Sequence, residues 1–395
     1  MNPPAVPPAG LPDDPADPDD SDDSDDLPLP TTAGPAPATG APLRLRLRGP
    51  GELVAAVPHL LGFVPTDSLV LIAVRDVGGR PQLGAVVRID LPAPDDAVAA
   101  VAACARRMGR REPEEVAAVV IGGRGDGDVG EAGPAGRPPP RPDVVEAVEE
   151  LFAAVRVPVR ARLWVPRIAE GVGWRCYPPC DCAGVLPDTV GSTAALATTM
   201  LGQVTFASRD DLEQLVRPDP EASSQRRRLL LDRAHESAAL DRELAGPAAA
   251  YRDLVAVRRA VVEIGGGATF GDAEIARLAV ALCDPGVRDA CLAFALGGPG
   301  IAPSAAEALW TLLVRAVPAP EVAEPATLLA CAALVRGGGA LVGAALARAH
   351  AADPGHTLSV LVARLLDTGI GHAEFLEWVR RGASDAERGL LGRSA

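Results

Sequence analysis

Lysine is absent from this sequence of 395 residues, so all 38 of its basic Lys or Arg side chains are arginines. Schiff-base catalysis, covalent attachment of pyridoxal phosphate and the phosphate-binding lysine of a P-loop all require an amine side chain. The sequence therefore excludes these three kinds of site.

Several other signals are missing. No stretch of about 18 uncharged apolar residues is present, so we expect no membrane span. The first residues, MNPPAVPPAG, lack the basic start and apolar middle of a secretory signal. Neither G-x-S-x-G nor H-E-x-x-H occurs, which removes two common hydrolase signatures. These absences favour a protein that is neither membrane-bound nor an enzyme.

The seven cysteines are an odd number, which argues against a complete disulfide framework. Four of them lie in apolar, helix-like surroundings, as reduced thiols used for core packing do. We therefore expect a cytoplasmic protein. These four are Cys104, Cys283, Cys291 and Cys331.

Negative charge is concentrated at the N-terminus. Residues 1–42 contain nine Asp and no Glu or Arg, and the net charge of the whole chain is −14, which leaves −5 for residues 43–395. The tail has little to bury and is predicted to be disordered. The nearly balanced remainder has no field that would attract nucleic acid, so no nucleic-acid partner is expected.

Residues 43–186 alternate between strand and helix patterns. Leu43, Leu45 and Leu47 alternate with arginines, and Ser68–Val74 is apolar throughout, as a strand covered on both faces would be. Interleaved strands and helices predict an α/β domain with a mixed, layered sheet. The other expected strands are 87–91, 116–121, 159–165 and 174–177.

Residues 187–381 show only helix patterns, so an all-helical domain is expected, followed by a flexible C-terminus at 382–395. One helix pair, Thr327–Arg336 and Ala340–Ala351, is separated by Gly337–Gly339 and followed by Asp353-Pro354. This order is similar to one tetratricopeptide repeat, although its early aromatic positions hold Ala or Leu. The alternative is an ordinary antiparallel helix pair.

Four stretches, 56–74, 186–216, 283–297 and 338–370, together resemble an actinobacterial family catalogued as domain of unknown function 4192. The most specific part is Gly62-Phe63-x-Pro65-x-Asp67-Ser68-Leu69-Val70. The resemblance covers roughly residues 44–375. It supports the two-part layout, implies cysteines in the loop near residue 180, and brings no established activity.

Three thiols occur within seven residues at Cys176, Cys180 and Cys182. They fit one zinc ion, but a structural zinc site needs a fourth ligand. His59 or His235 could supply it only if the fold brings one of them close. A redox thiol and simple loop packing are the alternatives. No other cofactor is predicted.

Asp67 and Ser68 precede the apolar strand and are candidate ligand-binding residues, because binding residues often lie on loops of a rigid scaffold. The alternative is that they only shape the turn. Gly125–Gly130 matches G-x-G-x-x-G, but the proline-rich segment after it cannot form the helix that a dinucleotide site requires.

The sequence thus favours a non-catalytic binding or scaffolding protein that contacts a protein or peptide through its helical domain. The alternative is an enzyme or metal-dependent regulator in which Asp67, Ser68 and the cysteine loop converge within about 10 Å around one pocket. The oligomeric state stays open.

Overall fold

A computed structural model describes residues 49–76, 81–109, 113–123, 138–200 and 203–394. Three expectations fall outside these residues. They are the acidic tail at 1–42, the strand at 43–48 and the glycine motif at 125–130.

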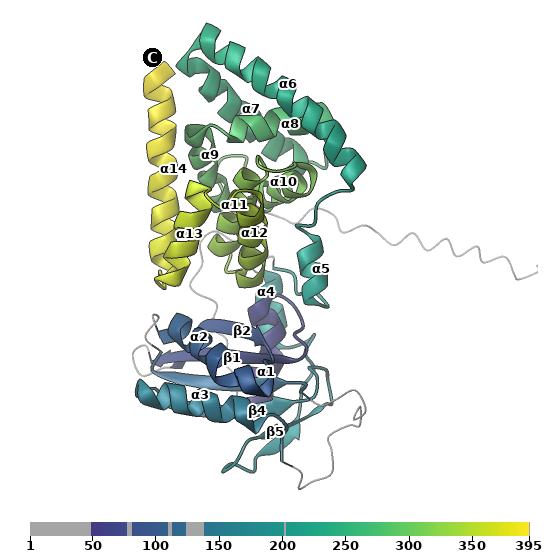
Figure 1. The fold of residues 1–395 in the computed structure, drawn as a ribbon, viewed down its shortest axis with the longest axis vertical. Coiled ribbons are helices and arrows are strands. Elements are labelled where there is room, and N and C mark those ends of the chain that lie inside the picture. The colour runs from purple at the N-terminus through teal and green to yellow at the C-terminus, as the bar shows by residue number, and fades with distance from the viewer. Residues whose placement is uncertain (1–48, 77–80, 110–112, 124–137, 201–202, 395) are drawn as a thin grey trace, which may run out of the picture. The chain divides into compact units, whose positions relative to one another are not determined.

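The N-terminal part contains one mixed sheet of six strands in the order β2-β1-β3-β4-β5-β6. Strands β3 and β4 pair in parallel, and all other neighbours pair antiparallel. The mixed-sheet domain predicted from the sequence is therefore confirmed (Figure 1). The strands are β1 (Ser68–Asp76), β2 (Pro81–Asp90), β3 (Glu115–Ile121), β4 (Val159–Val165), β5 (Gly173–Cys176) and β6 (Ala183–Val185).

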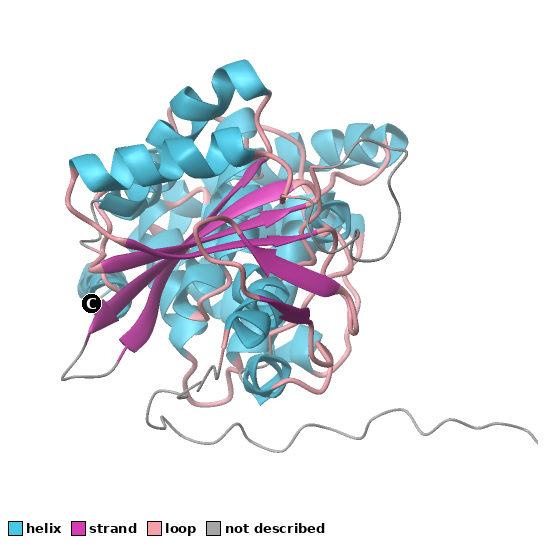
Figure 2. Ribbon diagram, turned by 90° about the horizontal axis from the view of Figure 1, so that it is seen from below, coloured by secondary structure: helices cyan, strands magenta, loops and turns pink. Residues whose placement is uncertain are grey.

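Helices cover both faces of this sheet (Figure 2). Because successive side chains of a strand point to opposite faces, Leu69 and Leu71 pack on one side while Val70 and Ile72 pack on the other. The first face is covered by α2 (Ala97–Gly109) and α3 (Pro142–Ala154), and the second by α1 (Pro50–Leu61). A short 3-10 turn, η1 (Pro94–Asp96), precedes α2.

The C-terminal part is helical, as predicted. Its core consists mainly of Ala, Val and Leu, with Trp310 and Phe375 also buried. No helix of the described residues is long and apolar enough to cross a membrane. The helices are α4 (Thr193–Met200), α5 (Arg209–Gln214), α6 (Glu221–Ala245), α7 (Pro247–Gly265), α8 (Asp272–Leu282), α9 (Pro285–Cys291), η2 (Leu292–Leu296), α10 (Pro303–Ala316), α11 (Ala323–Val335), α12 (Gly339–Ala352), α13 (Thr357–Asp367) and α14 (His372–Ser394).

Leu212 packs in the core on the α1 face of the sheet, whereas Val216 packs in the helical core. The domain boundary at residue 187 stays a prediction. The C-terminus is helical to Ser394 instead of flexible from residue 382. Its apolar side chains Ala383 and Leu390 are buried in the helical core, which holds α14 in place.

The helices α11 and α12 form the pair expected from the glycine break, with a turn at Gly337–Gly338 between them. Ten of the thirteen residues of α11 are buried, on all sides of the helix. A helix covered in this way cannot contribute to an exposed concave surface. Membership of a tetratricopeptide array stays a prediction.

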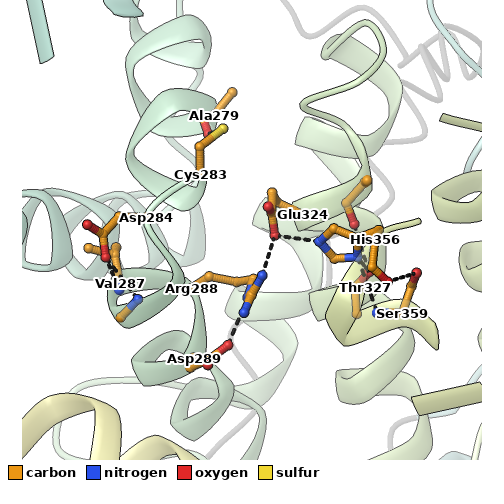
Figure 3. A network of polar contacts seen from close by, with 12 residues as sticks. Ala279, Cys283, Asp284, Val287, Arg288, Asp289, Glu324, Thr327, His356 and Ser359 are labelled. Carbon is orange, nitrogen blue, oxygen red and sulfur yellow. Dashed lines mark hydrogen bonds and ion pairs between the residues drawn. The ribbon is translucent and has the colours of Figure 1, made fainter. Parts of the chain in front are cut away.

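A buried polar network joins α9, α11 and the start of α13 (Figure 3). The Arg288 guanidinium lies 3.2 Å from Glu324 and 2.8 Å from Asp289. The backbone N–H of Ser359 donates to Nδ1 of His356 at 3.2 Å, so the ring proton lies on Nε2. The Nε2–H of His356 donates to the Glu324 carboxylate at 2.9 Å. Glu324 therefore accepts from two helices and neutralises a buried arginine.

We expect Glu324→Gln to lower the free energy of unfolding by about 3 kcal/mol, because it leaves Arg288 with a weaker partner set in a buried site. Glu377→Gln is the matched control, since Glu377 pairs with Arg380 and Arg381 on the exposed side of α14, where solvent screens the charges and the loss should be much smaller. Urea denaturation followed by circular dichroism measures both. Equal losses in the two variants would contradict the role of Glu324.

Candidate metal centre

The cysteine loop joins two short strands at one edge of the sheet. Strand β5 pairs with β6 so that Gly173 faces Val185 and Arg175 faces Ala183. Between these pairs Trp174 faces Gly184, where a Cβ atom would lie only 3.0 Å from the indole ring. A glycine at residue 184 therefore allows the buried Trp174 ring to lie against the backbone of its own hairpin.

The loop is tied to the sheet at both ends. The N–H of Cys176 donates to the carbonyl of Cys182 at 2.8 Å, which extends the β5–β6 ladder. The N–H of Tyr177 donates to the carbonyl of Arg162 on β4 at 2.9 Å, and its buried hydroxyl donates to the carbonyl of Pro140. These bonds fix the first and last cysteines of the loop relative to the sheet.

The three thiols converge. The Sγ atoms of Cys176, Cys180 and Cys182 all lie within 4.8 Å of one another. Cys176 and Cys180 are half-buried and Cys182 is exposed. No other group of three or more His, Cys, Asp or Glu ligands comes together in this way among the described residues.

The surroundings shift the pKa values of the three thiols in different directions. Burial, together with hydrogen bonding to Cys180, raises the pKa of Cys176 to about 12. Hydrogen bonds from Cys182 and then Cys176 lower the pKa of the Cys180 thiol. The pKa of Cys182 is raised, first by its hydrogen bond to Cys180. Of the three thiols, Cys180 therefore loses its proton most readily.

The histidines considered as a fourth ligand are engaged elsewhere. His59 on α1 contacts the Thr205 hydroxyl and the Thr189 carbonyl, each at 3.0 Å, so both ring nitrogens are used. His235 on α6 lies 3.1 Å from Glu321. Neither belongs to the thiol cluster, and no fourth His, Cys, Asp or Glu of the described residues joins it.

Asp67 lies in the turn that leads into β1, and Ser68 is the first residue of that strand. Asp67 has a positive φ of 36° and its Oδ1 accepts the N–H of Gly123 at 3.0 Å. Ser68 is fully buried, donates to the Thr66 carbonyl at 2.5 Å and accepts from Arg88 at 2.8 Å. These contacts hold the turn against β2 and β3, and a ligand-binding role for either residue stays a prediction.

The expectation of one shared pocket is wrong. Ser68 lies on β1 and Cys176 on β5, with β3 and β4 between them. Three strand spacings of about 4.8 Å separate these residues by about 14 Å even before their offset along the strands is counted. The register therefore divides the candidates into two places, a thiol cluster and a structural turn.

Sequence reasoning missed the residues that position these two places. Trp174 is enclosed by Gly184 and by Gly51, where a Cβ atom would lie 2.9 Å from the indole nitrogen. At Gly122 a Cβ atom would lie 2.2 Å from Oδ1 of Asp67. The only sequence signal was a glycine next to a strand, which indicates close backbone approach without naming the group that approaches.

A family model described as Domain of unknown function (DUF4192) matches residues 50–372. The chain belongs to this family. The match covers both the sheet and most of the helical part, including the cysteine loop, and confirms the resemblance noted from the sequence. Comparison with curated proteins and with solved structures gave no match. The family description assigns no activity, so any function must be argued from the geometry.

The turn at Asp67 can be tested with two glycines that share a positive φ, 75° at Gly122 and 73° at Gly171. Gly171→Ala should cost about 1 kcal/mol of unfolding free energy, because a Cβ atom there meets only the backbone penalty. Gly122→Ala should cost about 3 kcal/mol, because the Cβ atom also displaces the Asp67 carboxylate. Urea denaturation measures the difference, and similar losses would show that the Asp67 contact contributes little.

Proposed function

We propose that this protein is a non-catalytic binding protein whose best-defined site holds one thiophilic metal ion at Cys176, Cys180 and Cys182. The observation that carries the proposal is the mutual approach of the three Sγ atoms, all within 4.8 Å. Thiolate ligands of this kind suit zinc and other ions that prefer sulfur over oxygen.

The dimensions of the cluster fit such an ion. Zinc–sulfur bonds of about 2.3 Å in tetrahedral geometry place neighbouring sulfur atoms about 3.8 Å apart. A cluster whose sulfur atoms lie no more than 4.8 Å apart needs only a small contraction to reach this spacing. A cation also removes the repulsion that would otherwise oppose three adjacent thiolates, which explains how all three can ionise together.

Three protein ligands leave one coordination position of a zinc ion open. Zinc sites with three protein ligands take water or an exogenous ligand in the fourth position. Because Cys182 is exposed, that position faces solvent rather than a closed core. The site is therefore suited to a regulatory ion whose outer ligand can exchange.

Zinc binding should be stoichiometric in the full chain and should weaken strongly in Cys176→Ser, Cys180→Ser and Cys182→Ser. Each variant loses one sulfur atom that binds the metal directly. The zinc affinity should therefore fall by more than the about 10–100-fold that follows the loss of an outer-sphere partner. Cys283→Ser is the control, because that half-buried thiol only donates to the Ala279 carbonyl at 3.4 Å.

Elemental analysis of the purified protein and competition with a chromophoric chelator measure the stoichiometry and affinity. Zinc below a tenth of the protein concentration after loading would rule out the site. So would a zinc affinity in the Cys176→Ser, Cys180→Ser and Cys182→Ser variants equal to that of the Cys283→Ser control.

A second candidate function is the binding of a protein or peptide by the helical part. Apolar side chains are exposed along one face of α6 and along one face of α7. Their spacings, 11 and then 4 residues on α6 and 4 and then 7 residues on α7, are those of residues that share one face of a helix. Exposed apolar surface of this kind marks interaction sites more often than isolated residues do. The side chains are Leu229, Leu240 and Leu244 on α6, and Tyr251, Val255 and Val262 on α7.

Affinity purification of the full chain should recover a partner that the double variant Leu240→Glu, Leu244→Glu does not, because the carboxylates would be desolvated in an apolar interface. The matched control is Val98→Glu, an exposed apolar residue on α2. Recovery of the same proteins by the wild type, the double variant and the Val98→Glu control would contradict the involvement of α6.

We place both activities in a reducing cytoplasm, because all seven cysteines are free thiols. We infer no nucleic-acid partner, since the chain carries a net charge of −14 and Arg227, in a run of three arginines, pairs with Asp219 and Asp272.

A further inference from the structure

Two of the three hairpin cysteines lie directly opposite each other. The register of β5 and β6 pairs Arg175 with Ala183, and the next pair along the same ladder is Cys176 and Cys182. The hydrogen bond from the Cys176 N–H to the Cys182 carbonyl, at 2.8 Å, confirms that the ladder continues to this pair. Side chains of opposite residues project from the same face of a sheet, so the two thiols face the same side.

This placement suits a disulfide. Hydrogen-bonded opposite residues in antiparallel strands have Cα atoms about 5.5 Å apart, inside the range of about 4.4–6.8 Å over which disulfides form. Cys180 has no such strand partner, because it lies in the turn between the two strands. The pair that the backbone prepares for a bond is therefore Cys176 with Cys182.

The pair can also be reached by an oxidant and by a reductant. Cys182 is the one exposed thiol among the seven cysteines. Cys283 is half-buried, as Cys176 and Cys180 are, and the other three, Cys104, Cys291 and Cys331, are buried. Among free thiols, oxidation selects those that solvent can reach. The hairpin is thus the part of the chain where thiol chemistry is accessible.

We propose that Cys176 and Cys182 form a reversible cross-strand disulfide, and that its formation by a peroxide-class oxidant releases the metal ion. The metal part of this inference rests on the proposed function, whereas the disulfide part does not. The hairpin then acts as a redox-controlled metal site.

The chemistry balances with hydrogen peroxide as the oxidant. The exposed Cys182 thiol gives up its proton to solvent as its sulfur attacks one peroxide oxygen, so that a sulfur–oxygen bond forms, the oxygen–oxygen bond breaks, and the departing hydroxide takes up a proton as water. The Cys176 thiol then attacks the sulfenic sulfur, the disulfide forms, and the hydroxide that leaves takes the Cys176 proton and departs as water. Two thiols have lost two electrons and one peroxide has gained them.

Oxidation removes two of the three sulfur ligands from the ion. A single remaining thiolate at Cys180 cannot hold zinc in competition with water and buffer, so the ion dissociates. An external dithiol reverses the reaction by thiol–disulfide exchange, because the disulfide lies at an exposed hairpin.

The experiment treats the full chain with hydrogen peroxide, once loaded with zinc and once metal-free. A zinc-binding dye follows metal release, and mass spectrometry after cleavage on the N-terminal side of Asp181 locates the disulfide, since this cut separates Cys182 from the other two cysteines. We expect zinc release in step with the loss of two thiols, a cross-link that joins the two fragments, and recovery of both thiols with dithiothreitol.

Two variants decide which pair reacts. Cys180→Ser should form the cross-link as readily as the wild type, because it retains Cys176 and Cys182, whereas Cys176→Ser should lose it. No cross-link in Cys180→Ser, an equal cross-link in Cys176→Ser, or oxidation with zinc fully retained would overturn the inference. The metal-free chain separates the two claims: a chain that binds no zinc but still forms the disulfide contradicts the proposed function alone.

Discussion

Burial of the central strands on both faces is the constraint on which the rest of the N-terminal structure depends. β1 and β3 hold almost only Val, Leu, Ile and Ala, and helices on both sides exclude water from them. Since strand side chains alternate, a slip of one residue would exchange the sets that face α1 and α2, so the register is fixed. That register extends through β4 to β5 and β6 and determines where the cysteine hairpin lies.

The hairpin itself is a small structure on a rigid base. Trp174 anchors it on the α1 face through contact with Gly51 and Gly184, and Tyr177 anchors it on the other face, beside α3. The loop between these anchors carries the thiols and approaches solvent. Such an arrangement allows the ligand atoms to respond to a metal ion or an oxidant while the sheet behind them stays unchanged.

Local patterns predicted most of the elements. The apolar run at Ser68–Val74 and the expected strand at 159–165 became β1 and β4. Strand β6 was missed because three residues with one glycine carry no readable period. The length of α14 was missed because its buried residues, Ala383 and Leu390, are separated by polar ones and gain their burial only from distant helices.

The candidate site could be found from sequence only as a set of residues. Three cysteines in seven positions indicated thiol chemistry, but their convergence depends on the pairing of β5 with β6, which spacing does not show. The separation of Asp67 from the cysteines likewise follows from strand order alone. X-ray absorption spectroscopy at the zinc edge of the loaded chain is the sharpest test of the proposed metal site. Coordination by Cys176, Cys180 and Cys182 should give three sulfur ligands at about 2.3 Å with one lighter ligand, whereas a shell without sulfur would rule the site out.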